Sequence, residues 1–126
     1  MKKLNINQFD DEKEEEIAAA LMSLGLGRAV ARTLAFLNNG EEATSIALEQ
    51  GTGLRQPEVS IAAKQLIELG WIDEREEKRK QGKGRPNKVY SLKVGFNKII
   101  AQLENQQKKA IDEMQENIER LRELGK

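Results

Sequence analysis

Residues 49–70 read EQGTGLRQPEVSIAAKQLIELG, and this stretch decides the fold that the chain is expected to adopt. Its first part, EQGTGLRQ, is a tight turn rich in glycine, the residue that most easily takes up unusual backbone conformations. Pro57 suits the first turn of a helix, where the missing N–H costs nothing. The helix that follows has one apolar face, formed by Val59, Ala62, Ala63, Leu66 and Leu69. The stretch therefore predicts two helices joined by a tight turn, with Gly70 closing the second.

Three helical patterns precede this helix. After a short arm of residues 1–9, a first helix is predicted from about Asp11 to Ser23, with Ile17, Ala18 and Leu21 inward and Leu24 beside them. A second helix is predicted in GRAVARTLAFLNN, residues 27–39, and a third, short one in EEATSIALEQGTG, residues 41–53. The apolar faces of the second and third helices are Val30, Leu34 and Leu37, and Ala43, Ile46, Ala47 and Leu48, respectively.

A β-hairpin is predicted after Gly70. WIDEREEK begins with Trp71 and Ile72 and continues into polar residues, and VYSLK supplies a second short β-prone run after a loop of about ten residues. We expect Trp71 and Tyr90 to be packed rather than to bind a ligand. The fold class is accordingly mainly α with a small β-hairpin.

Positive charge is concentrated at the tip of this hairpin. The stretch KRKQGKGRPNKVYSL, residues 78–92, holds six Lys or Arg and no Asp or Glu, in a chain with 21 basic and 21 acidic residues. The other residues carry 15 basic against 21 acidic side chains, so an acidic body contrasts with a cationic hairpin. Gly84 and Pro86 favour a shaped turn over a disordered charge run. Lys78, Arg79 and Lys80 can pair with the glutamates of the hairpin stem.

The last part of the chain, from Gly95 to Leu124, has a helical pattern with one narrow apolar stripe. The stripe advances in steps of three and four residues and has one polar member: Phe96, Ile100, Leu103, Gln107, Ile111, Met114, Ile118 and Leu121. A helix of this length spans about 45 Å, more than a small domain can cover. The pattern therefore favours a homodimer, formed together with the first helix and arm. Packing along the chain's own domain is the alternative.

Composition excludes several classes of function. The chain has no cysteine and no histidine, which removes the commonest nucleophiles, general bases and zinc ligands. We expect no catalytic activity, no metal site and no cofactor. The apolar runs are far shorter than the roughly 20 residues that span a bilayer, and the N-terminus does not resemble a signal peptide. These features predict a cytoplasmic protein without membrane contact.

The predicted order of elements is that of a winged helix-turn-helix. Residues 25–93, from GLGRAVARTLAFLNNG through ELGWIDERE to GKGRPNKVYSL, resemble the winged-helix core of prokaryotic transcriptional regulators of the archaeal TrmB-like and MarR/ArsR-like group. The resemblance implies a DNA-binding domain at 25–93, flanked by dimerisation segments at 1–24 and 94–126. It implies neither metal sensing, for which Cys and His are missing, nor the sugar-binding domain of full-length TrmB.

The resemblance also assigns DNA contacts to two elements. In the helix after the turn, which would enter the major groove, the exposed side is Arg55, Gln56, Pro57, Ser60, Ile61, Lys64 and Gln65. Gln56 and Ser60 are base-reading candidates, Ile61 could meet a thymine methyl group, and Arg55 and Lys64 suit phosphates. The Glu58 carboxylate would repel DNA unless it accepts a hydrogen bond from the amino group of a cytosine. In the wing, Lys83, Arg85 and Lys88 are the phosphate candidates, and Arg85 could instead enter the minor groove.

The sequence thus predicts a homodimeric, sequence-specific regulator of transcription that binds a pseudo-palindromic operator in double-stranded DNA. Two alternatives share the fold. The first is a nonspecific architectural DNA-binding protein, although such proteins often carry a high positive charge that this chain lacks. The second is a winged helix that docks a protein partner. No cluster of residues marks a site for a small-molecule effector.

Overall fold

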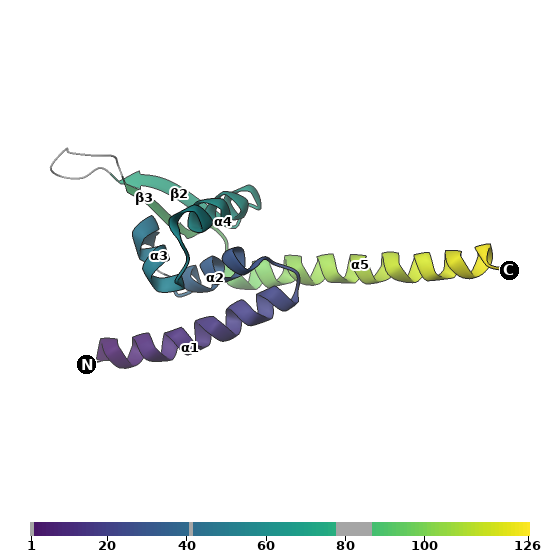
Figure 1. Ribbon diagram of the computed structural model, residues 1–126, viewed down its shortest axis with the longest axis horizontal. Coiled ribbons are helices and arrows are strands. Elements are labelled where there is room, and N and C mark those ends of the chain that lie inside the picture. Colours follow the sequence, from purple (N-terminus) through teal and green to yellow (C-terminus); the bar gives the residue numbers. More distant parts are fainter. Residues whose placement is uncertain (1, 41, 78–86) are drawn as a thin grey trace. The chain divides into compact units, whose positions relative to one another are not determined.

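The computed structural model describes residues 2–40, 42–77 and 87–126, with side chains for 12–40, 42–77 and 88–126 (Figure 1). Its elements are α1 (Lys2–Ser23), α2 (Arg28–Leu37), β1 (Ala43–Thr44), α3 (Ser45–Thr52), α4 (Gln56–Glu68), β2 (Ile72–Glu77), β3 (Asn87–Leu92) and α5 (Phe96–Leu124). The chain divides into two compact units, Met1–Val94 and Gly95–Lys126. The predicted fold class, a mainly helical winged helix-turn-helix with a long C-terminal helix, is confirmed.

A three-stranded antiparallel sheet in the order β1-β3-β2 forms one layer of the first unit. The predicted hairpin is present, because β2 pairs with β3 from Ile72 opposite Leu92 to Glu77 opposite Asn87. Strand β1 was not predicted: Ala43 and Thr44 pair with Tyr90 and Val89 instead of starting a helix. Thr44 keeps an extended backbone, and its hydroxyl accepts a hydrogen bond from the Ala47 N–H at 3.1 Å. Thr44 therefore caps α3, which begins at the next residue, Ser45.

The core lies where α2, α3 and α4 meet this sheet. Its largest fully buried side chains are Leu34, Leu37, Leu48, Val59, Leu66, Trp71 and Ile72. Ala62 and Ala63 are also buried, as the sequence predicts for α4, and Trp71 and Tyr90 are confirmed as packed residues. Because α4 packs on both α2 and α3, its inward face is fixed by two neighbouring helices.

Three apolar residues that were predicted to lie inward are exposed. Ile46 is 56% exposed because α3 buries Leu48 and Thr52, and a residue two positions before Leu48 lies on the other side of a helix. Leu69 is 47% exposed: it caps α4, and Gly70 at a φ of 79° turns the chain away into β2. Leu24, just beyond α1, is also exposed.

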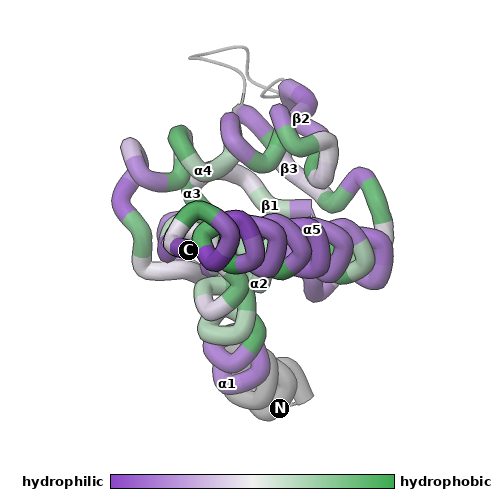
Figure 2. Tube along the Cα trace, turned by 90° about the vertical axis from the view of Figure 1, so that its right-hand side faces the viewer, coloured by the Kyte–Doolittle hydropathy of each residue, from purple (hydrophilic) through white to green (hydrophobic). Residues whose placement is uncertain are grey.

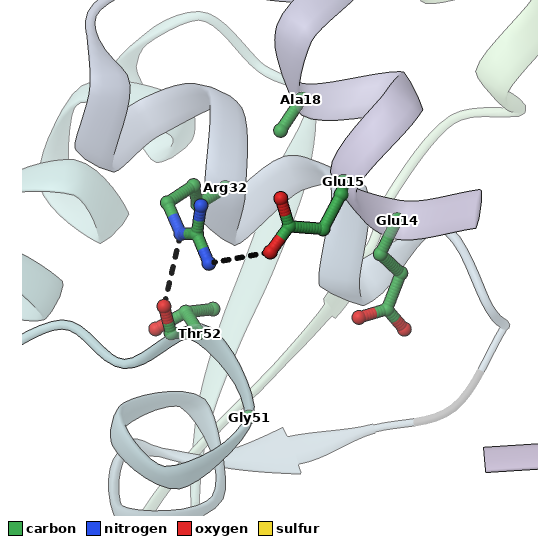
Figure 3. A pocket seen from close by; sticks show the side chains of 6 residues that line it. All are labelled: Glu14, Glu15, Ala18, Arg32, Gly51 and Thr52. Atoms are coloured by element: carbon green, nitrogen blue, oxygen red, sulfur yellow. Dashed lines mark hydrogen bonds and ion pairs between the residues drawn. The ribbon is translucent and has the colours of Figure 1, made fainter. Parts of the chain in front are cut away.

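Helix α1 begins at Lys2 instead of near Asp11, so the expected arm is helical. Its buried side chains Ala18 and Leu21 agree with the predicted inward face, which packs on α2. Arg32 of α2 joins three helices (Figure 3): its Nε donates to the Thr52 carbonyl of α3 at 2.9 Å, and its Nη2 lies 3.7 Å from Glu15 Oε2 of α1. These contacts fix α1 and the end of α3 to α2.

The turn between α3 and α4 depends on Gly53. This residue caps α3 at a φ of 75°, and its N–H donates to the Glu49 carbonyl at 2.9 Å. The Thr52 hydroxyl donates to the Leu48 carbonyl and accepts from the Leu54 N–H at 3.2 Å. Leu54 is buried, so the turn is anchored to the core.

Replacing Gly53 by alanine should lower the free energy of unfolding by about 1–2 kcal/mol, because a Cβ is strained at positive φ. No atom lies within 4 Å of the added methyl group, so the loss would come from the backbone alone. Gly53→Asn is the control, since asparagine tolerates this conformation better and should lose less. Urea unfolding of the three proteins measures the difference; equal losses would contradict it.

Helix α5 forms the second unit. Every residue from Glu104 to its end is exposed, and the tube in Figure 2 is predominantly hydrophilic along this helix. Among these exposed residues are the large apolar side chains Ile111, Met114, Ile118, Leu121 and Leu124. No helix in the described part of the chain is long and apolar enough to cross a membrane.

Candidate nucleic-acid interface

The outer face of α4 is built by the same periodicity that buries its inner face. Because Val59, Ala62, Ala63 and Leu66 are buried, the residues between them project to solvent. All seven predicted contact residues of this element are exposed: Arg55, Gln56, Pro57, Ser60, Ile61, Lys64 and Gln65. The sequence therefore identified the exposed face of α4 correctly, and the DNA contacts themselves stay a prediction.

The polar side chains on this face are available to a ligand. Within the described residues, the side chains of Gln56, Ser60, Lys64 and Gln65 make no hydrogen bond or ion pair. Ile61, in their midst, is 61% exposed. The face thus offers amide, hydroxyl and ammonium groups around one apolar side chain, the combination that reads base edges and thymine methyl groups.

Glu58, which would repel DNA if it projected freely, is used inside the protein. Its Oε1 accepts the Arg55 backbone N–H at 3.0 Å, which caps the start of α4. Its Oε2 lies 3.9 Å from Arg28 Nη1 at the start of α2. The carboxylate is half-buried and partly neutralised, so its conflict with a DNA-binding face is reduced.

Arg28 was not identified from the sequence. The packing of α2 on α4 brings this exposed cation beside the start of α4, although the two residues of the ion pair are far apart in the chain. Arg28 is the first residue of its helix, in the sequence GLGRAV, and no local signal separates it from other surface arginines. Only the tertiary contact adds it to the candidate interface.

The wing is described only at its stem. Lys88 of β3 is exposed, and its Nζ lies 3.9 Å from Glu74 Oε2 of β2, so this predicted phosphate contact shares its charge with a carboxylate. Lys83 and Arg85, like Lys78, Arg79 and Lys80, lie outside the described residues. Arg75 of β2 is also paired: its Nε donates to Glu42 Oε2 at 3.3 Å.

The Glu42–Arg75 pair is the one place in the described part where a pKa shift is resolved. The hydrogen bond from Arg75 lowers the pKa of the Glu42 carboxyl, and the same hydrogen bond raises the pKa of Arg75. Both side chains are about half exposed, so solvent screens the pair and its contribution to stability is small. Its role is to link β2 to the residue before β1, and it keeps Arg75 from acting as a free cation.

Acidic side chains do not gather into a metal-binding cluster in the described part of the chain. They contain no group of three or more His, Cys, Asp or Glu side chains that could hold a metal ion. A cavity of about 180 Å³ lies between α1, α2 and the end of α3, lined by Glu14, Glu15, Ala18, Arg32, Gly51 and Thr52 (Figure 3). The Arg32 guanidinium in this cavity is already bound to Thr52 and Glu15, so it is a structural contact.

Comparisons with known proteins agree with this geometry. The family model "MarR family" matches residues 24–83, which include α2, α3, α4 and β2. No curated protein matches the chain. The winged-helix core of this chain is therefore similar to that of MarR-family proteins, and the resemblance predicted from the sequence is confirmed at this level. A TrmB-like origin stays a prediction.

Two solved structures show the fold over most of the chain. A possible transcriptional regulator from Methanosarcina mazei Go1 is 16% identical, with a TM-score of 0.62, and the match covers 86% of this chain and 85% of that one. A second structure, a transcriptional regulator, is 23% identical, with a TM-score of 0.55, and the match covers 83% of this chain and 67% of that one. At these identities the likeness concerns the fold.

Proposed function

We propose that the protein is a sequence-specific DNA-binding transcriptional regulator that acts as a homodimer. Helix α4 enters the major groove, and the wing contacts the DNA backbone or the minor groove. The observation that carries the proposal is the outer face of α4, whose polar side chains are exposed and uncommitted while its inner face is buried in the core. A helix exposed in this way can enter a groove without unfolding any part of the domain.

Base reading and phosphate binding are assigned to different residues. Gln56 and Ser60 contact bases, since an amide can pair with adenine and a hydroxyl with several base edges. Ile61 meets a thymine methyl group, while Arg55, Lys64 and Arg28 contact phosphates on either side. In the wing, Lys83, Arg85 and Lys88 supply phosphate contacts that add affinity more than specificity.

Residues 1–24 and 94–126 supply the dimer contacts. A two-fold axis then presents two copies of α4 to successive major grooves, about 34 Å apart, so the operator is pseudo-palindromic. The acidic body of the protein and its cationic wing orient it on the duplex and limit binding to unrelated DNA.

The proposal is tested by comparing binding to the DNA upstream of the protein's own gene with binding to random DNA at several salt concentrations. A regulator should prefer a site in its own upstream region, or in another region recovered by genome-wide capture, by about 10³-fold or more. Equal affinity for all DNA would favour the architectural alternative. No binding to any DNA would favour docking of a protein partner.

Single substitutions on α4 should separate the two kinds of contact. Lys64→Ala should weaken binding to all sequences and flatten the salt dependence by about 0.9 in the log–log slope, because one phosphate contact is lost. Arg85→Ala in the wing should do the same. Ser60→Ala or Gln56→Ala should instead change the preference among operator variants at one position.

Lys126→Ala is the matched control, since it removes the same charge at the end of α5, where Lys126 pairs with Glu123. Its salt slope should equal that of the unchanged protein. Uniform weakening by Ser60→Ala and Gln56→Ala, with no change in preference, would refute the base-reading role.

A further inference from the structure

Arg28 and Glu58 form a loose ion pair at the edge of the candidate interface. Arg28 Nη1 lies 3.9 Å from Glu58 Oε2, which is too far for a hydrogen bond, and the two side chains are 57% and 45% exposed. Within the described part of the chain, Arg28 takes part in no other ion pair. Because an exposed pair without a hydrogen bond is weak, Arg28 can leave Glu58 at small cost.

Glu58 is fixed more firmly than Arg28. Its Oε1 accepts a hydrogen bond from the Arg55 N–H at 3.0 Å, and this bond holds the carboxylate at the first turn of α4. The ion pair uses the other carboxylate oxygen, Oε2. Glu58 can therefore keep its place as the cap of α4 when the Arg28 side chain moves away.

The position of Arg28 beside α4 brings it close to a DNA backbone when α4 lies in the major groove. A helix with its side chains is about 10–12 Å wide and the groove is about 12 Å wide, so a phosphate backbone runs along each flank of the helix. Arg28 lies beside the first turn of α4, where it faces Glu58. A phosphate oxygen can accept a charge-assisted hydrogen bond from the guanidinium, which Glu58 does not do at its distance.

We propose that Arg28 exchanges partners on DNA binding, from the Glu58 carboxylate in the free protein to a phosphate in the complex. The proposal rests on the function proposed above, in which α4 enters the major groove, and it identifies Glu58 as a residue that opposes binding. Glu58 lowers the affinity for every DNA sequence for two reasons. Its ion pair with Arg28 must be broken, and its carboxylate then remains close to the phosphate.

Two other roles of Glu58 predict different results when its charge is removed. If Glu58 accepted a hydrogen bond from cytosine, the loss would change the preference among sequences. If Glu58 stayed paired with Arg28 in the complex and held it against the phosphate, the loss would weaken binding. Competition for Arg28 predicts tighter binding to all sequences alike, because phosphate contacts carry no sequence information.

Glu58→Gln removes the charge and keeps the cap, since the amide oxygen can also accept the Arg55 N–H. The dissociation constant should fall about two- to fivefold, for the operator and for a duplex of mixed sequence alike. Glu116→Gln is the matched control: it removes the same charge from α5, outside the candidate interface, and should leave both constants nearly unchanged. Urea unfolding checks the cap, because Glu58→Ala, which loses it, should unfold at a lower urea concentration than Glu58→Gln.

A double-mutant cycle tests the exchange of partners directly. Arg28→Ala should weaken binding to DNA, and by about two- to fivefold more in the Glu58→Gln protein than in the unchanged one. The reason is that in the unchanged protein the loss of the phosphate contact is partly offset, since no ion pair has to be broken. In urea unfolding of the same four proteins the coupling should have the opposite sign, because the pair stabilises the free protein.

The outcomes separate this proposal from the proposed function. If the unchanged protein binds neither duplex, the proposed function itself is wrong. If it binds DNA but Arg28→Ala has no effect, or an equal or smaller effect in the Glu58→Gln protein, the exchange of partners is overturned while DNA binding stands. A changed sequence preference in Glu58→Gln would also overturn it and would assign Glu58 to base reading.

Discussion

Replacing both Ile111 and Ile118 by glutamate should give a folded monomer that binds the operator at least about 100-fold more weakly. Both side chains are roughly half exposed in the single chain, so the change should not disturb the winged-helix domain. In a dimer the same positions are buried, and two unpaired carboxylates there would oppose association. A monomer engages one half-site and loses the gain from binding two linked sites, about 10²- to 10⁴-fold.

The matched control is Asn105→Glu with Lys109→Gln, which shifts the charge of α5 by the same two negative units away from its apolar face. This variant should remain a dimer and keep most of its operator affinity at the same salt concentration. Light scattering gives the mass, circular dichroism the helix content, and titration with operator DNA the affinity. A monomeric double mutant with unchanged affinity would show that α4 needs no second copy.

Replacing Leu66 by alanine should lower the free energy of unfolding by about 2–5 kcal/mol, the usual cost of a large-to-small change in a packed core. Leu66 is 0% exposed on the inner face of α4, so truncating its side chain leaves a cavity in the core. A loss of this size is a large part of the stability of a small domain. The variant is expected to be partly unfolded at 37 °C and to bind DNA weakly for that reason alone.

Ile61→Ala is the control on the same helix, because it removes a similar apolar side chain that is 61% exposed. Its free energy of unfolding should change by less than about 0.5 kcal/mol. Its affinity for an operator with a thymine at the contacted position should nevertheless fall by roughly 1 kcal/mol. Urea unfolding and DNA titration of both variants test this division. Similar stability losses would contradict the assignment of the two faces of α4.

Local patterns predicted most of the elements. The apolar spacing of α4, the glycine-rich turn before it and the β-prone runs around the basic loop are determined by neighbours within a few residues, and the structure confirms them. The exposed face of α4 was predicted from the residues that do not belong to its apolar face. The long α5 was also evident, because its narrow stripe continues from Phe96 to Leu121, about seven turns, without a break in helix-forming residues.

The sequence-based predictions were wrong where contacts with residues distant in the chain outweighed the local pattern. Ala43 and Thr44 suit the start of a helix by residue type. In the folded chain they instead pair with the backbone of β3, which is distant in the sequence. Ile46 is apolar, yet α3 is short and its neighbours cover the side that holds Leu48. Sequence spacing alone cannot rank two possible inward faces of an eight-residue helix.

The sequence by itself determined the winged-helix order, the apolar and polar faces of α4, and the concentration of positive charge in the wing, because each depends on periodicity or composition. Only the tertiary structure decided that Glu58 is held by the Arg55 N–H and Arg28, that Lys88 shares its charge with Glu74, and that β1 completes the sheet. These features depend on contacts between residues that are distant in the chain. The physical reason is that only packing brings such residues together, so the local sequence pattern does not predict them.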